Sequence, residues 1–414
     1  MMRALLLYLF LLATGSAFGR TIEVGATKAV CSLRRGIALA HSGDTVLLHA
    51  GTYREGNIII SKPLTLIGIG GPVLDGQGRF EQLTISGERI RVRGLRFTGT
   101  GYSSMNDNAA ISIIDARFVT IEGNCIERAY FAIHVANASY CTIANNRIAG
   151  IPRTEQTSGN GIHLWKCARM LVQHNDVQGH RDGIYFEFVT ASEIRRNYSH
   201  DNIRYGLHFM FSNNDAYEAN TFASNGAGVA VMYSNHVRME RNFFRRNWGA
   251  NAYGLLLKEI SDAQIRENVF EANTAGIMME STNRVEVLAN AFRSNGWALR
   301  ISASCNENTV CLNNFQGNTF DVATNGDLML NRFFNNYWDK YDGYDLNRDG
   351  KGDVPYHPVS LYSMVIERNP QSVMLLRSFM VTLLDKAEKA MPSLTPGQMV
   401  DAAPLMKPYR YDRH

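Results

Sequence analysis

Histidine and methionine side chains recur at matching offsets in the middle of this chain, a combination that suits a soft metal ion. Segments of the form Gly-[Ile/Leu/Val]-x-[Leu/Phe/Val]-x place His163 and His208 at the first variable position and Met210 and Met232 at the second. Imidazole and thioether suit Cu(I), whereas hard cations prefer oxygen ligands. We therefore predict a copper site from these four side chains, open to solvent and weakening as pH falls through the ordinary histidine range.

The same variable positions supply other side chains to the same predicted face. We assign them to a partner-binding groove, and they are His134, Trp165, Tyr185, Glu187 and Met278. Insertions at 99–108, 151–159 and 248–251 directly precede these segments and would wall the groove, as loops on a rigid scaffold often do. The alternative is that the methionines only pack beneath the insertions and that the histidines are hydrogen-bonded bystanders.

A long repeat must position these residues. Ten asparagines recur, mostly 22 or 23 residues apart with single steps of 29 and 26: Asn124, Asn146, Asn175, Asn197, Asn220, Asn242, Asn268, Asn290, Asn313 and Asn336. The residue three positions before each is apolar, and so is the residue two positions after in all cases but one. A fixed period with short apolar segments is typical of stacked coils, so we predict an all-β solenoid.

The N-terminal sequence predicts an export signal followed by a cap. Residues 1–19 combine Arg3, a short apolar run and small residues, which is typical of a cleavable signal peptide and too short to span a bilayer. Residues 27–41 look helical, and with the following "GDTVLLHAGTY" they resemble the cap of right-handed parallel β-helices. We therefore expect a right-handed parallel β-helix over residues 20–340, its N-terminal helical cap included.

Composition bounds the rest of the interpretation. A hydrophobic content of 45% supports a large folded core, and a formal charge of +4 without a long basic run argues against a nucleic-acid partner. Cys141 occupies an inward position and is best explained as a small buried hydrophobe. Cys305 and Cys311 fall in one coil and have the option of pairing, which the sequence leaves open.

The segment 341–369 is rich in Asp and Gly, and we expect it to close the C-terminal end of the solenoid. Part of it matches the first nine positions of a calcium loop, with candidate ligands Asp345, Asn347, Asp349 and Asp353. The twelfth position is Tyr356 instead of the usual glutamate. Calcium binding and a simple Asx-rich turn therefore both remain open.

The C-terminal residues 370–414 predict an amphipathic helix from about 370 to 390, followed by an extended tail. Its apolar stripe is a candidate surface for docking on a membrane protein complex, and it contains Met374, Leu376, Phe379, Met380 and Leu383. The alternative is that the helix packs on the solenoid and caps it.

An enzyme is the main alternative class, because parallel β-helices often carry polysaccharide lyases, epimerases and glycosidases. Their chemistry needs paired carboxylates, or a base beside a cation. The predicted groove contains Glu187, Glu280, Lys258, Asp182 and Arg300, but its two glutamates lie four coils apart. We therefore expect a protein that is not an enzyme, with a polysaccharide lyase or epimerase as the alternative.

Two sets of motifs are similar to the NosD family over essentially the whole chain after the signal. They are the coil segments "GIHLWKC", "GIYFEF", "GLHFMFSN" and "GVAVMYSN", and the terminal block "NNYWDKYDGYDLNRDGKGDVPYHP". The resemblance implies a periplasmic component of an ABC-type complex with a membrane permease and a cytoplasmic ATPase. It also implies work with the copper-binding lipoprotein NosL in assembling the copper centres of nitrous oxide reductase.

On this resemblance, His208, Met210 and Met232 lie in the matching motif and are the first candidates for transient contact with Cu(I), with His163 next. The tail helix would dock on the permease. The resemblance implies an assembly factor without catalytic residues. It leaves open whether copper or a sulfur species is delivered, and in what stoichiometry.

Overall fold

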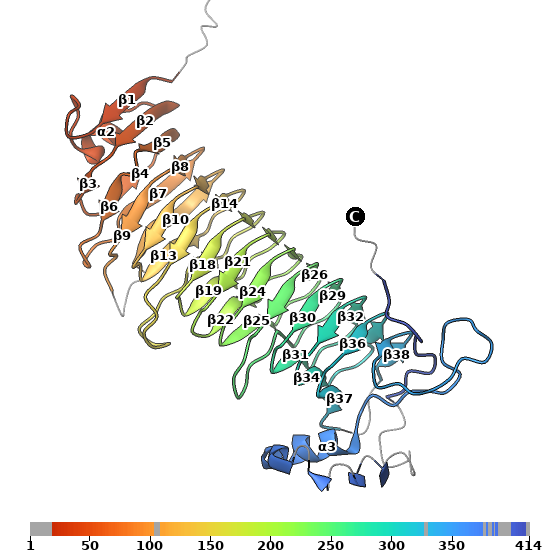
Figure 1. The fold of residues 1–414 in the computed structure, drawn as a ribbon. Coiled ribbons are helices and arrows are strands. Elements are labelled where there is room, and N and C mark those ends of the chain that lie inside the picture. Colours follow the sequence, from red (N-terminus) through yellow and green to blue (C-terminus); the bar gives the residue numbers. More distant parts are fainter. Residues whose placement is uncertain are drawn as a thin grey trace, which may run out of the picture.

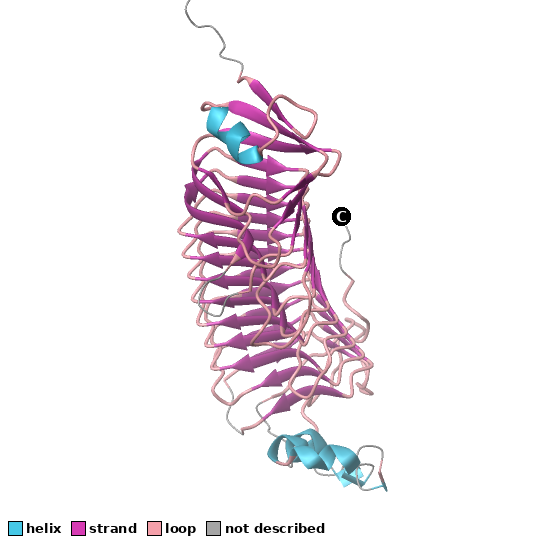
Figure 2. Ribbon diagram, turned by 90° about the vertical axis from the view of Figure 1, so that its left-hand side faces the viewer, coloured by secondary structure: helices cyan, strands magenta, loops and turns pink. Residues whose placement is uncertain are grey.

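The chain winds into a right-handed parallel β-helix, which confirms the predicted fold class (Figures 1 and 2). The computed structural model describes residues 19–102, 108–326, 330–375, 378–379, 383–384, 386–387 and 399–410. Each coil contributes one strand to each of three parallel sheets, of 14, 13 and 12 strands. The predicted signal peptide lies almost entirely outside the described residues.

Sheet 1 holds the strands that precede the asparagine turns. In order along the axis they are β1 (Thr21–Val24), β2 (Asp44–His49), β5 (Leu64–Ile69), β8 (Arg91–Arg93), β11 (Thr120–Glu122), β14 (Thr142–Ala144), β17 (Leu171–Gln173), β20 (Glu193–Arg195), β23 (Ala216–Glu218), β26 (Arg238–Glu240), β29 (Gln264–Arg266), β32 (Glu286–Leu288), β35 (Thr309–Cys311) and β38 (Arg332–Phe334).

Sheet 2 holds the strands that follow the asparagines. They are β3 (Thr52–Tyr53), β6 (Val73–Asp75), β9 (Arg96–Thr98), β12 (Cys125–Glu127), β15 (Arg147–Ala149), β18 (Asp176–Gln178), β21 (Tyr198–His200), β24 (Thr221–Ala223), β27 (Phe243–Arg245), β30 (Val269–Glu271), β33 (Ala291–Arg293), β36 (Asn314–Gln316) and β39 (Tyr337–Trp338).

Sheet 3 holds the longer strands that carry the histidines and methionines. They are β4 (Ile58–Ile60), β7 (Leu83–Glu88), β10 (Ala109–Arg117), β13 (Phe131–Ala136), β16 (Ile162–Trp165), β19 (Asp182–Glu187), β22 (Tyr205–Met210), β25 (Ala227–Met232), β28 (Leu255–Lys258), β31 (Ala275–Glu280), β34 (Trp297–Ile301) and β37 (Phe320–Thr324).

The repeated asparagines form a continuous buried ladder at the turn between sheets 1 and 2. The Oδ1 of Asn220 accepts from the backbone N–H of Asn197 at 2.9 Å and from its Nδ2 at 3.0 Å. The Nδ2 of Asn220 donates to the carbonyl of Ile194 at 2.8 Å. Each asparagine thus satisfies backbone groups that a sharp turn would leave unpaired inside the protein.

Aromatic side chains two residues after these asparagines stack along the axis inside the solenoid. Neighbouring rings have centroids 4.1–5.5 Å apart, in the column Phe222, Phe244, Phe270, Phe292, Phe315 and Trp338. Such pairs contribute roughly 0.5–1.5 kcal/mol each beyond the area that they bury. The column therefore holds the register of the C-terminal coils from within.

The N-terminal end of the core is covered by α2 (Leu33–Leu39), which is shorter than the helix expected over 27–41. Ser32 caps it by accepting from the N–H of Arg35, and Glu55 accepts from the N–H of Leu33 at 2.7 Å. Because these oxygens satisfy the free N–H groups of the first turn, the helix begins at Leu33. Leu33 and Ile37 are buried against the first coils.

The helix expected from about 370 to 390 is described only in part, and the residues described as helical there are 379, 383, 384, 386 and 387. A further helix, α3 (Leu361–Arg368), lies within the Asp/Gly-rich segment 341–369, and a 3-10 turn, η1 (Pro370–Leu375), follows it. Asn369 ends α3 with an extended backbone, because a residue before proline is disfavoured in the helical region. Of residues 376–398, only three pairs lie among those that the structure describes.

The chain after residue 398 closes the C-terminal end of the solenoid, where we had expected an extended docking tail. Asp401 and Leu405 form parallel bridges with Phe333 and Tyr337. The Oδ2 of Asp401 accepts from the backbone N–H of Asn336 at 2.9 Å and from its Nδ2 at 3.0 Å. Asp401 thus takes the place that a further asparagine would occupy. No helix in the described part of the chain is long and apolar enough to cross a membrane.

We predict that replacing one ladder asparagine lowers the stability of the whole solenoid. Asn220→Ala would leave the N–H of Asn197 without an acceptor and the carbonyl of Ile194 without this donor. The expected loss in the free energy of unfolding is about 3 kcal/mol. Urea denaturation measures it, with the exposed loop variant Asn251→Ala as control. Equal stability of the two variants would contradict this role of the ladder.

Candidate functional site

Three histidines and a tyrosine form one column on the outer side of sheet 3. His134, His163, Tyr185 and His208 are direct register partners on β13, β16, β19 and β22. Successive ring centroids lie 5.0, 4.8 and 4.8 Å apart. We call these four side chains the imidazole–phenol ladder. The residues that the sequence spaced at matching offsets are therefore in contact through their rings.

A second column runs beside the ladder, two residues further along each strand. Trp165, Glu187, Met210 and Met232 are register partners from β16 to β25. The Sδ of Met210 accepts from the hydroxyl of Tyr185 at 3.9 Å. Two thioethers on adjacent strands thus lie next to the ring column. The sheet spacing of about 4.8 Å brings Met210 and Met232 within reach of one small ion.

The two predicted histidine ligands point away from the interior but are buried, contrary to our expectation of a site open to solvent. His163 is 9% exposed and His208 is 5% exposed. Phe131 covers His163 with a centroid distance of 5.6 Å, and Tyr205 lies 4.8 Å from His208. The side chains of this face therefore cover one another, and the predicted groove is filled where the two histidines lie.

Several polar atoms of this face are buried without a hydrogen-bond partner among the described residues. They are both ring nitrogens of His163, Nε2 of His208, and both side-chain polar atoms of Asn160, which is fully buried. Buried polar groups nearly always have partners, and an unpaired one costs about 1–3 kcal/mol. These atoms are therefore free to bond a group that is absent from this structure. Asn160 was missed from sequence because its position in the coil pattern carries no recurring residue type.

A buried carboxylate lies at one end of the ladder. Asp182 is fully buried and accepts from Nε and Nη2 of Arg204 at 3.1 and 3.2 Å. Burial alone would raise the pKa of Asp182. The hydrogen bond with His208 and the charges of Arg204 and Arg181 outweigh burial and hold that pKa below its ordinary value. A negative charge is therefore retained beside the histidines.

Arg204 and Asp182 compete for the same nitrogen of His208. Nδ1 lies 3.0 Å from Nη2 of Arg204 and 3.7 Å from Oδ2 of Asp182. A bare Nδ1 accepts from Arg204, whereas a protonated Nδ1 donates to Asp182. In the second arrangement a neutral ring carries a lone pair on Nε2, as a metal-binding histidine requires. Arg204 was another residue that the sequence did not single out.

Burial also fixes the charge of His163. Desolvation lowers the pKa of its imidazole to about 3, and the charges of His134 and Arg181 act in the same direction. The ring is therefore neutral far below the ordinary histidine range, which corrects the expected weakening of this ligand near pH 6. Burial, followed by the charge of Glu187, raises the pKa of Tyr185 to about 12, so its phenol stays protonated.

Met278 lies further along the ladder's column, three strands beyond His208, with Ala230 and Leu256 between them. It packs against an apolar cluster on the outer face that includes Leu256 and Tyr253, and Met232 packs against the same cluster. The sequence-predicted groove residues therefore share one face. Met278 is separated from the ladder by apolar side chains.

The predicted calcium loop bonds mainly to its own backbone. Asp345 accepts from the N–H groups of Asp349 and Gly350 at 3.2 and 2.9 Å, and Asp353 accepts from that of Leu346 at 2.6 Å. This pattern favours the Asx-rich turn. Across the described ranges, no group of three or more His, Cys, Asp or Glu side chains is placed to hold a metal ion. Calcium therefore remains a prediction without support from the geometry.

The predicted docking residues are described only in part. Met374 is 87% exposed, Phe379 is 80% exposed and Leu383 is 48% exposed. Leu376 and Met380 lie outside the described residues. Three large apolar side chains that follow α3 are thus presented to solvent.

Several side chains considered for sugar chemistry form ion pairs, either with one another or with α3. Glu280 lies 3.9 Å from Lys258. Arg300 forms a two-bond ion pair with Glu367 of α3, with both distances 2.9 Å. Glu187 lies on β19 and Glu280 on β31, four strands apart and roughly 19 Å by the spacing of parallel strands. These two glutamates do not form a catalytic pair.

All six cysteines are free thiols in this structure. Cys305 and Cys311 do not pair, and Cys141 is buried in the core as expected. Burial raises the pKa of Cys167 to about 12. Its thiol is therefore unreactive at neutral pH.

We predict that His163 contributes a measurable acid sensitivity. The pKa of His163 is about 3 in the folded protein and near 6.5 in the unfolded chain. Below pH 6.5 the unfolded chain therefore binds more protons, and the stability of the fold decreases as the pH is lowered. At pH 5 the ring alone should account for about 2 kcal/mol. Asp215, whose pKa burial raises to about 8, acts in the opposite direction, so variants must be compared.

Urea denaturation at pH 7.5 and 5.0 measures this contribution. When the pH is lowered from 7.5 to 5.0, the unfolding free energy of His163→Phe should fall by about 2 kcal/mol less than that of wild type. An identical pH dependence in both proteins would show that His163 titrates normally.

Comparisons with known proteins fit this geometry. The family described as "Periplasmic copper-binding protein (NosD)" matches residues 149–347, which include His163, Tyr185, His208 and both methionines. Among solved structures, the catalytic unit of a GH87 α-1,3-glucanase from Streptomyces thermodiastaticus has a TM-score of 0.59 at 15% identity, covering 74% of this chain and 65% of that one. The Streptococcus pneumoniae adhesin PfbA has a TM-score of 0.53 at 14% identity, covering 70% and 82%. These two likenesses show the fold alone.

Two curated relatives carry the name "Probable ABC transporter binding protein NosD". The Pseudomonas aeruginosa protein is 30% identical over 392 residues, which cover 90% of this chain and 90% of the relative. The Stutzerimonas stutzeri protein is 29% identical over 381 residues, covering 87% and 86%. With this identity over nearly its whole length, the chain belongs to the NosD family.

Proposed function

We propose that this chain is a periplasmic copper-binding protein that works with an ABC-type membrane complex. We further propose that it receives or presents Cu(I) during assembly of the copper centres of nitrous oxide reductase. The family description and the relatives' names support the first statement. The observation that carries the proposal is the set of unpartnered imidazole nitrogens beside two thioethers on one face of sheet 3.

The donor set fits copper by its chemistry. His163 and His208 offer ring nitrogens without partners, and Met210 and Met232 offer thioether sulfurs on neighbouring strands. Soft sulfur ligands with imidazole select Cu(I) over hard cations. His163 is neutral, so no proton competes at its ring near neutral pH.

The surroundings suit temporary binding. The ligands belong to rigid strands, but Phe131 and Tyr205 cover the two histidines and must shift for an ion to enter. Asp182 is placed to accept from Nδ1 of His208 once Arg204 releases that nitrogen. Copper would then be held only after a partner or the ion itself has moved Arg204 away from His208, which favours transfer over permanent storage.

The exposed side chains after α3 provide the proposed contact with the membrane permease. The α3 helix is fixed to sheet 3 through the ion pair of Arg300 with Glu367 and through packing of Tyr362 and Ile366 on Phe320. It therefore holds the following segment at the end of the face that carries the copper ligands. We propose the lipoprotein NosL and nitrous oxide reductase as the other partners in copper transfer.

One observation favours a second candidate, a sugar-active enzyme. Asp182, Arg204 and His208 lie in contact, next to the Tyr185 phenol, and so place a carboxylate, a cation, a base and an acid together. Lyase and epimerase chemistry uses such groups. Because Asp182 already neutralises Arg204, we rank this function below copper handling.

We expect wild-type protein to bind Cu(I) and the double variant His208→Ala/Met210→Ala to bind it at least about tenfold more weakly, since two soft ligands are lost. Anaerobic competition against a coloured Cu(I) chelator measures the affinity. The matched control is Met278→Leu, which removes a thioether from the same face outside the ladder. It should leave the affinity unchanged.

Equal Cu(I) affinity of wild type and the double variant would rule out metal binding by this face. The protein would then be a scaffold that binds its partners without metal. Release of unsaturated or reducing ends from acidic polysaccharides by the purified protein would instead favour the second candidate.

We predict that the triple variant Met374→Ser/Phe379→Ser/Leu383→Ser is no longer recovered with the membrane permease and its ATPase. These side chains are exposed, so the change removes apolar contact area without opening the core. Affinity purification of the complex from membranes measures recovery. Removing all residues after 369 would be a poorer test, because Asp401 closes the solenoid.

The control for this test is Leu346→Ser, which replaces a 79% exposed apolar side chain in another loop. It should leave recovery unchanged. Normal recovery of the triple variant would rule out the segment after α3 as the docking surface.

A further inference from the structure

Five exposed aromatic side chains line one long edge of the solenoid, at the turns that lead from sheet 3 to sheet 1. Each is 36–44% exposed, and we call the set the aromatic edge: Phe118, Tyr140, Phe188, Phe211 and Tyr233. Phe118 and Tyr140 stack with ring centroids 5.1 Å apart, and the other three stack at 5.2 and 5.0 Å. The rings thus form two short stacks that present their rims to solvent.

The fold does not require aromatic residues at these positions. All five have a left-handed backbone, with φ between 51° and 56°. Side chains with a Cβ are strained in this region, and asparagine tolerates it better than a bulky residue does. At the position of Phe188, other coils place Asn137 and Ser281. Rings on strained and exposed turns add little to the core, which indicates a contact outside the chain.

Unpaired cations flank the rings of the first stack. Arg117 lies over Phe118 and Tyr140, with its guanidinium carbon 5.5 and 5.7 Å from the two centroids. Arg169 lies over Tyr140 at 5.2 Å and donates to its hydroxyl. Lys166 is exposed three residues before Arg169. None of these three cations forms an ion pair with a residue that the structure describes.

Two carboxylates belong to the same stretch of the edge and leave it positive. Glu88 is the register partner of Arg117, but that arginine turns to the rings and the two form no ion pair. Asp115 is exposed two residues before Arg117, and Arg89 is exposed next to Glu88. Across the described turns from 88 to 169, four cations therefore stand against two carboxylates.

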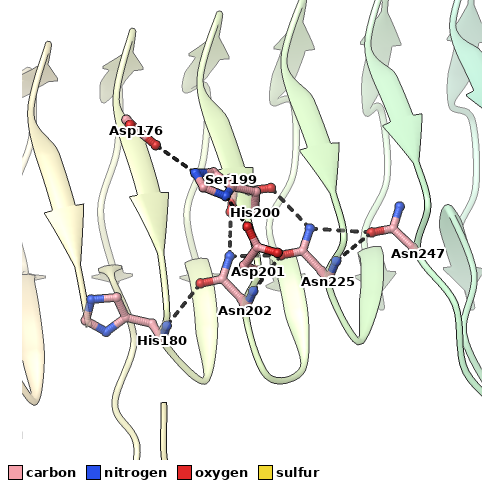
Figure 3. Close-up of polar contacts among 8 residues, drawn as sticks. All are labelled: Asp176, His180, Ser199, His200, Asp201, Asn202, Asn225 and Asn247. Carbon is pink, nitrogen blue, oxygen red and sulfur yellow. Dashed lines mark hydrogen bonds and ion pairs between the residues drawn. The ribbon is translucent and has the colours of Figure 1, made fainter. Parts of the chain in front are cut away.

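Charges elsewhere on the surface are paired. Further along the same edge, Arg284 bonds Asp262 through two hydrogen bonds of 2.7 and 2.8 Å. On sheet 2, His200 contacts Asp176 at 3.0 Å through one ring nitrogen and Asp201 through the other (Figure 3). The aromatic edge instead keeps its positive charge available for a negatively charged partner.

A shallow hollow separates the two ring stacks. It has a volume of about 430 Å³, and Ser139, Lys166, Phe188 and Thr190 are among the residues that line it. Ser139 directly precedes Tyr140, so the hollow touches both stacks. It has room for a side chain that projects from a partner, and Lys166 in its wall suits a carboxylate.

The second stack borders the face that carries the copper ligands. Phe211 directly follows Met210 in the chain, and Tyr233 directly follows Met232. These methionines end their strands of sheet 3, and the rings begin the turns that follow. A molecule held by the rings therefore lies beside the thioethers.

We propose that the aromatic edge docks the acidic surface of a protein that exchanges copper with this chain. The exchange of copper rests on the proposed function, whereas the acidity of the partner is argued from the unpaired cations. Aromatic and arginine side chains supply much of the binding energy at protein interfaces. Rings that are already held by stacking lose little freedom when a partner binds.

The stacking favours a protein over a sugar chain as the occupant. Sugars bind on open faces of aromatic rings, but Phe211 has Phe188 against one face and Tyr233 against the other. Tyr140 likewise has a ring of the preceding coil and Arg169 of the following coil against it. Rims and guanidinium groups remain for contact, and these suit the mixed apolar and acidic side chains of a protein.

Biolayer interferometry tests the docking site with the soluble form of NosL and with copper-free nitrous oxide reductase, the partners proposed above. Phe188→Ser/Phe211→Ser should bind at least one of them about tenfold more weakly, because two anchoring rings are lost. Ser281 occupies the same turn position in another coil, so serine fits there. The control Tyr198→Ser/Phe334→Ser removes two rings of matching exposure from sheets 2 and 1 and should bind as wild type does.

Arg117→Gln/Arg169→Gln tests the charge of the edge. Its association with the same partner should be about fivefold slower and should depend less on salt, because unpaired cations steer an acidic partner. The control Arg245→Gln/Arg293→Gln changes two exposed arginines of sheet 2 and should associate at the wild-type rate. Equal rates for the two double variants would refute an acidic partner.

The Cu(I) competition assay separates this inference from the proposed function. Phe188→Ser/Phe211→Ser keeps all four candidate ligands and should bind Cu(I) as wild type does. A wild type that binds no Cu(I) would refute copper handling, and the docking site would then be judged by partner binding alone.

The docking site is refuted if wild type binds neither protein, or if Phe188→Ser/Phe211→Ser binds as wild type does. Binding to phosphatidylglycerol vesicles or to alginate that is lost in the same variant would also overturn the proposal, since the edge would then serve a membrane or a glycan.

Discussion

Every other feature of this protein depends on hydrogen bonding between identical coils. Parallel strands stack at a spacing of about 4.8 Å, so any side chain repeated at one coil position meets its own kind above and below. Asparagine suits that geometry at a turn, because its amide both accepts from the coil on one side and donates to the coil on the other. The residue before each ladder asparagine adopts a left-handed backbone, as Ala219 does with φ of 54°. Its strain, of order 1 kcal/mol, is offset by these bonds.

The same regularity explains why a face of sheet 3 accommodates soft ligands. Side chains in register stay within about 5 Å of one another whatever their chemistry, so His163, Tyr185 and His208 become a stacked column without any special loop. Stacking also removes the two histidines from water. The resulting burial keeps His163 neutral and leaves its nitrogens without partners, two properties that a solvent-exposed histidine would lack.

Charge around the ladder is balanced locally. Asp182 is fully buried yet ionised, because Arg204, Arg181 and His208 surround it. His180, two residues earlier, is neutral because burial lowers its pKa to about 4. Burial thus keeps His163 and His180 neutral, whereas charged neighbours keep Asp182 ionised.

The sequence by itself determined the solenoid, its register and the identity of the columns, because a period repeated many times leaves one arrangement in which Asn220 meets Asn197 and Met210 meets Met232. It did not determine burial of the ladder, the role of Asn160 and Arg204, or the closure of the stack by Asp401. These contacts join residues without a repeated spacing, some of them more than 60 positions apart. Periodicity carries information only about what recurs, so single contacts between irregular loops and a regular sheet were decided by the tertiary structure alone.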